Sequence, residues 1–197
     1  MATYLNKDLC FGLIDVPFSG ASQALNSMYS VFPDFKQRRN DAASLPIPVH
    51  ASITDLHRVI GSAIFDYFLV AFVRNTFELL LVRYNFVKSN PRHPDHERCL
   101  LYTFEDYVFA EGQTVRIREQ HPMVLSETSG VTLIANSRCF SNVLREILTE
   151  LGAPPEIFIP RPPELCISYR EYYSETMREH VSKVYAEDIK KFGFEFD

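Results

Sequence analysis

Four small residues near the N-terminus could bind an anion. They follow the apolar run Cys10–Val16, and Ala24–Phe32 then carries apolar residues at helical spacing, so we predict a buried strand, a tight loop and a helix. The first amides of a helix have no partner within the helix and attract negative groups. A strand-to-helix turn needs small residues in any case, so a purely structural loop stays open. The candidate anion-binding residues are Ser19, Gly20, Ala21 and Ser22.

Arg74 is a second candidate. It follows Phe68–Val73, whose apolar run predicts another buried strand. Parallel strands end at the same edge of a sheet, so a cation here could contact a phosphate bound at the first loop. The alternative is an ion pair between Arg74 and a nearby carboxylate.

The other elements predict an α/β protein. Ser52 and Asp55 form a capping pattern, so a helix is expected to follow them. Strands that alternate with helices indicate a central, mostly parallel sheet with helices on both faces. The length fits a single domain over residues 1–197. Further helices are expected over 77–87, 140–151 and 174–189, with a short helix from Thr103. Loops are expected over 33–48 and 88–98, and a strand over 130–135.

Composition excludes several classes of function. The chain has 197 residues, with 20 Lys+Arg against 25 Asp+Glu, and this acidic balance argues against a general nucleic-acid binder, while a local basic patch stays open. It has no apolar stretch of the roughly 18 residues that a membrane span needs, and residues 1–8 do not resemble a signal peptide, so a cytoplasmic protein is expected.

His93 and His96 lie in a polar, proline-containing segment that indicates a solvated loop, and no metal is expected. The four cysteines are far apart and are interpreted as buried free thiols: Cys10, Cys99, Cys139 and Cys166.

Four segments, in the same order, resemble the carbohydrate-type sulfotransferases, which use 3′-phosphoadenosine 5′-phosphosulfate (PAPS). Phe72–Phe86 is similar to the family's FVRNPxxRLxSxYxF segment, and Val49–Ser52 to its KHAT segment. Tyr169–Phe194 is similar to its YxxYY…VxxxYxxDIxxFGYxF ending. Pro17–Ser22 occupies the place of its PKTGGTS loop. The resemblance extends from about residue 9 to 197.

The resemblance implies a fold, a reaction and roles for residues. The fold is the P-loop-containing nucleotide-binding type, and the reaction transfers a sulfuryl group from PAPS to a hydroxyl of a sugar or small metabolite. The loop at Ser19–Ser22 is expected to bind the phosphosulfate, and Arg74 the 3′-phosphate of PAPS or of its product PAP. His50, in the segment similar to KHAT, is the expected general base. A surface or capping role for His50 is the alternative.

The chain also departs from the family at functional positions. Phe18 stands where the loop has Lys, and Val82 where the 3′-phosphate site has Ser. Fixed donors aimed at developing charge contribute about 10²–10³ in rate each. These changes therefore favour an alternative: a degenerate member that binds a nucleotide or partner without transfer, or a different transferase or lyase that reuses the pocket. The acceptor and the oligomeric state cannot be read from the sequence.

Overall fold

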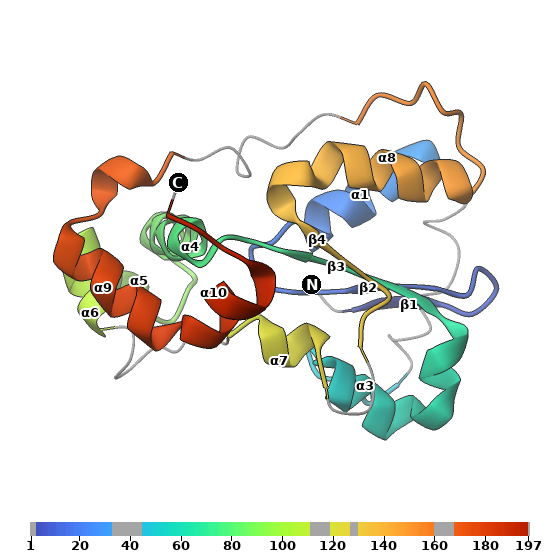
Figure 1. The fold of residues 1–197 in the computed structure, drawn as a ribbon, viewed down its shortest axis with the longest axis horizontal. Helices are drawn as coiled ribbons and strands as arrows, with labels where there is room; N and C mark the ends of the chain where they lie inside the picture. Colours follow the sequence, from blue (N-terminus) through green and yellow to red (C-terminus); the bar gives the residue numbers. More distant parts are fainter. Residues whose placement is uncertain (1–2, 33–44, 111–118, 127–129, 160–167, 197) are drawn as a thin grey trace. The chain divides into compact units, whose positions relative to one another are not determined.

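The computed structural model describes residues 3–32, 45–110, 119–126, 130–159 and 168–196. By internal packing the chain separates into a first unit, residues 1–73 and 122–165, and a second unit, residues 74–121 and 166–197. The two units are described in turn (Figure 1). The expected single domain over 1–197 stays a prediction.

A four-stranded sheet forms the centre of the first unit, in the order β1-β2-β3-β4. β2 is parallel to β3, and β3 to β4, whereas β1 is antiparallel to β2. The sheet is therefore mixed and mostly parallel, and the α/β class is confirmed. The strands are β1 (Tyr4–Asn6), β2 (Phe11–Ile14), β3 (Phe68–Val73) and β4 (Leu133–Asn136).

Helices cover both faces of this sheet, as predicted. Figure 1 shows α1 and α8 on one face and α3 on the other. Strand side chains on the first face, such as Phe11 and Phe72, share a buried core with Met28 and Leu144 of these helices. The helical elements are α1 (Ala21–Val31), α3 (Ile53–Ile60), η2 (Gly61–Asp66), α7 (His121–Val124), η3 (Ser137–Cys139) and α8 (Phe140–Glu150).

The predicted cap before α3 is present. The Ser52 hydroxyl oxygen accepts a hydrogen bond from the Asp55 amide at 3.1 Å, and the Asp55 carboxylate accepts one from the Ser52 amide at 3.0 Å. These two bonds satisfy backbone donors that a helix start leaves without partners. They fix the start of α3, and with it the chain that follows His50.

Strand β1 was not predicted, because three residues are too few to show an alternating pattern. The turn after it is held by the Asn6 side chain, whose Oδ1 accepts a hydrogen bond from the Leu9 amide at 3.0 Å. Cys10 then adopts a positive φ of 48° before β2 begins. The antiparallel edge strand follows from this tight turn, so the sheet is not purely parallel.

Gly12 allows β2 to pack closely between its neighbours, so Gly12→Ala is expected to destabilise the fold by about 1–3 kcal/mol. An added Cβ would lie 2.6 Å from Cδ2 of Leu69 and 2.7 Å from Cδ2 of Leu5. Urea denaturation measures the change in the free energy of unfolding. Gly130→Ala is the control, because its nearest atom would be 4.0 Å away, and it should change stability by less than about 0.5 kcal/mol. Equal stability of the two variants would contradict this account of Gly12.

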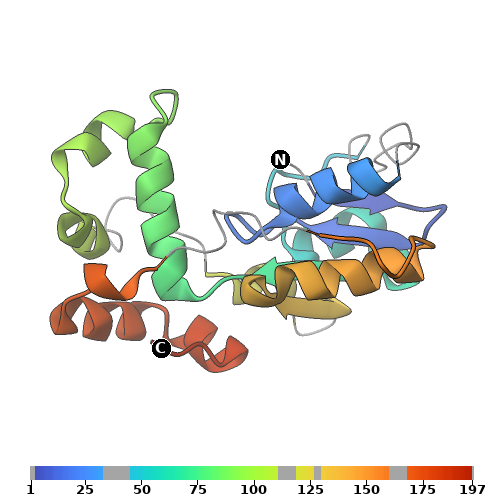
Figure 2. The same cartoon turned by 90° about the horizontal axis from the view of Figure 1, so that it is seen from above.

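The second unit is helical, and its C-terminal segment packs on helices from a much earlier part of the chain, α4 and α6. Figure 2 shows the C-terminal helices, in red, beside the green helices α4 and α6. No helix among the described residues is long and apolar enough to cross a membrane. The helices are α4 (Thr76–Ser89), α5 (His96–Leu101), α6 (Phe104–Ala110), η5 (Arg170–Tyr172), α9 (Glu175–Val184) and α10 (Ala186–Phe192).

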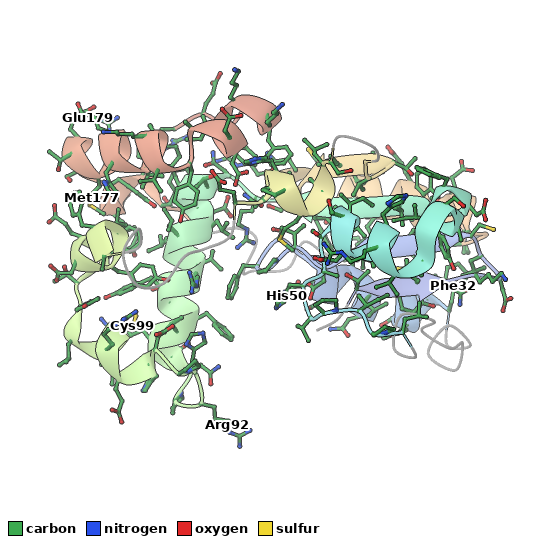
Figure 3. The ribbon with its side chains drawn as sticks, turned by 90° about the horizontal axis from the view of Figure 1, so that it is seen from below. Phe32, His50, Arg92, Cys99, Met177 and Glu179 are labelled. Carbon is green, nitrogen blue, oxygen red and sulfur yellow. The ribbon has the colours of Figure 1, made fainter. Side chains whose placement is uncertain are left out.

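An aromatic core joins these helices. The ring of Tyr173 packs edge-on against Phe77 and Phe104, and its hydroxyl donates to the Phe77 carbonyl at 2.8 Å. Burial raises the pKa of Tyr173, so this hydroxyl remains a donor. Met177 is buried on the inner side of α9, and Glu179 is exposed on its outer side (Figure 3).

Three sequence expectations need correction: two on the helices of the second unit and one on the cysteines. The helix expected over 174–189 breaks at Tyr185, whose φ of −111° and ψ of 30° are not helical. The loop expected over 88–98 is shorter, because α4 continues to Ser89 and α5 begins at His96. Cys10 and Cys139 are exposed rather than buried. Cys99 is buried as expected, and burial raises its pKa, whereas Cys166 lies outside the described residues.

Candidate functional site

The loop between β2 and α1 has the predicted strand-loop-helix form. Gly20 is the N-cap residue of α1 with a φ of 113°, a conformation that glycine adopts without steric cost. Phe18 also has a positive φ, 61°. The first turn of α1 contains no acidic residue that would compete with a bound anion. The helix begins directly after the loop, so the amides of Ala21 and Ser22 belong to its first turn.

Ser19 serves the loop itself. Its side chain is buried, its amide donates to the Val16 carbonyl at 3.3 Å, and its hydroxyl donates to the Pro17 carbonyl at 3.3 Å. A hydroxyl has one proton to donate, so this bond uses the Ser19 donor. We therefore expect donors to an anion from Ala21 and Ser22, with Ser19 maintaining the shape of the loop.

His50 contacts a buried carboxylate at the end of β2. Its Nδ1 lies 2.9 Å from Oδ2 of Asp15, the residue that follows the last residue of β2. The Asp15 side chain is only 7% exposed, and the His50 side chain is 38% exposed. The Asp15 amide in turn donates to Oγ1 of Thr3 at 3.5 Å. His50, labelled in Figure 3, comes from the turn before α3 and has a φ of 55°.

This contact is suited to proton transfer. When Nδ1 of a histidine faces a carboxylate, Nε2 is the nitrogen left to face a substrate. The carboxylate also stabilises the charge that the ring gains when it takes a proton. A positive φ at a residue other than glycine costs free energy, and such strain is found most often at functional sites. The site therefore places an imidazole against a buried carboxylate at the end of β2, two residues before the loop that opens α1.

Asp15 was missed by the sequence analysis. The residue does carry a signal, because it is an acidic side chain directly after a buried strand, and ligands bind beyond the carboxyl ends of such strands. Its partner could not be identified, because His50 lies 35 positions later in the sequence.

Arg74, in the second unit, contacts a carboxylate in the first turn of the helix that follows it, α4. Its side chain is fully buried, and its Nε lies 3.7 Å from Oε1 of Glu78, one turn later. This is the ion pair that the sequence analysis gave as the alternative. The contact of Arg74 with a phosphate stays a prediction.

The two histidines considered for a metal have backbone partners. Nδ1 of His93 accepts a hydrogen bond from the Asp95 amide at 3.1 Å, and Nδ1 of His96 lies 3.0 Å from the Val87 carbonyl oxygen. Among the described residues, no three His, Cys, Asp or Glu side chains gather as a metal site would require. Both histidines therefore have a structural explanation in the turn between α4 and α5.

Comparison of the chain with protein-family models, curated proteins and solved structures found no match.

Proposed function

We propose that this protein transfers a sulfuryl group from PAPS to a hydroxyl of a sugar or small metabolite. The observation that carries the proposal is the contact between Asp15 and His50, next to the loop that opens α1. The resemblance assigns the acceptor base and the phosphosulfate loop to these two segments. The proposal includes a fold of the P-loop-containing nucleotide-binding type. The α/β class and the mostly parallel sheet support it.

Each residue has a stated role in this reaction. Nε2 of His50 takes the proton of the acceptor hydroxyl as its oxygen attacks sulfur, and Asp15 stabilises the imidazolium that forms. A bond from the acceptor oxygen to sulfur forms, and the bond from sulfur to the bridging oxygen of PAPS breaks, which releases PAP. The amides of Ala21 and Ser22 stabilise the phosphosulfate at the head of α1. Arg74 is the expected contact of the 3′-phosphate.

Binding of a nucleotide without transfer is the second candidate. Two observations favour it: Phe18 replaces the lysine of the family loop, and Arg74 pairs with Glu78. In this case the amides at the head of α1 still bind an anion, but the charge on the leaving phosphate is not offset.

PAP is expected to raise the melting temperature, because a ligand that binds only the folded state stabilises it by about 2.7 kcal/mol at 100 times its Kd. Ser22→Asp should remove this shift, since its carboxylate would repel the anion. Asn26→Asp is the matched control, because Asn26 is exposed one turn further along α1, and its shift should remain. No shift at millimolar PAP, or an equal shift with Ser22→Asp, would refute binding at this loop. Labelled PAPS with a panel of hydroxyl acceptors then distinguishes transfer from binding alone.

A further inference from the structure

A buried hydrogen-bond network in the second unit joins the C-terminal helix α10 to the start of α4. Asp188 of α10 is 1% exposed, and its Oδ2 accepts a hydrogen bond from the Gln120 amide at 2.7 Å. Its Oδ1 accepts one from the His121 amide at 2.8 Å and lies 2.8 Å from Nδ1 of His121. One carboxylate therefore holds the backbone of two consecutive residues and orients an imidazole.

The Gln120 side chain continues the network to Arg74. Its Oε1 accepts a hydrogen bond from the Arg74 amide at 2.8 Å, and its Nε2 donates to the Arg74 carbonyl at 2.7 Å. Gln120 is 1% exposed. One amide side chain thus bonds to both backbone polar groups of Arg74, as a neighbouring strand would.

Arg74 needs such a partner because of its place in the chain. It lies between the last residue of β3, Val73, and the N-cap of α4, Asn75, so it belongs to neither element. A residue between a strand and a helix has two backbone dihedrals that neither element fixes. The two bonds from Gln120 fix them, and with them the direction in which the Cα–Cβ bond of Arg74 leaves the backbone.

We propose that Gln120 and Asp188 are positioning residues for Arg74. Asp188 holds the backbone at Gln120, and the Gln120 amide holds the backbone of Arg74, so that the guanidinium keeps one orientation at the first turn of α4. The inference rests on the proposed function, in which Arg74 contacts the 3′-phosphate. A guanidinium that is already oriented loses less entropy when it binds a phosphate. Sequence signals could not reveal the network, because its members lie 46 and 68 positions apart.

The first test compares two nucleotides. Gln120→Met removes both bonds to Arg74 and should weaken binding of PAP about 10- to 100-fold, while binding of adenosine 5′-phosphate, which lacks the 3′-phosphate, is unchanged. Arg74→Ala should have the same effect, and the double variant should be no worse than either single one. Equal weakening of both nucleotides, or additive effects of the two substitutions, would overturn the proposal.

The second test does not depend on nucleotide binding. Gln120→Met and Asp188→Asn should both accelerate hydrogen exchange of the Arg74 amide relative to the amides of β3. Ser174→Ala is the control, because it removes the N-cap bond to the Met177 amide in the same unit and should leave Arg74 unchanged. Unchanged exchange at Arg74 in the first two variants would refute the positioning role. The wild type could bind both nucleotides equally while hydrogen exchange of the Arg74 amide accelerates in both variants. Arg74 would then not contact the 3′-phosphate, but Gln120 and Asp188 would still position its backbone.

Discussion

His50→Asn is expected to lower the rate of sulfate transfer by about 10²–10⁴-fold while PAP still binds, because an amide cannot take a proton from the acceptor. Asparagine is chosen because it tolerates a positive φ better than most residues, and His50 has a φ of 55°. The fold should therefore be little affected. The rate is measured with labelled PAPS, and binding of PAP by calorimetry.

Asp15→Asn tests the partner of His50 in the same assay. It preserves the size of the side chain but removes the charge that orients the ring and stabilises the imidazolium, so transfer should again fall strongly with PAP binding retained. His57→Asn is the matched control, since His57 lies on α3 and its ring contacts Phe65. Transfer at the wild-type rate with His50→Asn would exclude His50 as the base. A loss of PAP binding would mean that the Asp15–His50 contact maintains the loop instead.

Local sequence signals predicted most of the first unit. The apolar runs of β2 and β3, the small residues before α1 and the cap at Ser52 and Asp55 each act over a few neighbouring residues, and each element formed where its signal lies. The alternation of strands and helices then predicted a mostly parallel sheet. The antiparallel β1 was missed because three residues carry too little pattern.

The contacts that could give these elements a function were not predictable in the same way. Asp15 meets His50 across 35 positions, and Asp188 meets Gln120 across 68. Such pairs depend on how elements pack, which no local pattern records. The break at Tyr185 was missed as well; it separates α9 from α10, whose Asp188 carboxylate bonds to the amides at 120 and 121. Helical periodicity alone predicted that α9 and α10 would be one continuous helix.

Phe18→Lys combined with Val82→Ser is expected to tighten PAP binding about 10- to 100-fold, because each residue restores a donor to a phosphate. Phe18 has a φ of 61°, and lysine bears a similar steric cost there because neither side chain branches at Cβ. Val82 is 9% exposed on α4, so the serine should lower stability somewhat without changing the loop. Calorimetric titration with PAP measures the change in Kd.

One control variant and one change of salt concentration identify the origin of any gain in PAP affinity. Phe18→Met with Val82→Ser removes the ring without adding charge, so an equal gain with this variant would mean that the ring had only obstructed the anion. A gain that comes from the lysine must shrink as salt is added, because ions screen an exposed charge pair. Unchanged affinity in both double variants would contradict a phosphate site at this loop. A tighter Kd together with a faster transfer rate than in Phe18→Met with Val82→Ser would identify Phe18 as the residue that limits turnover in the natural chain, since lysine offsets the charge on the leaving phosphate.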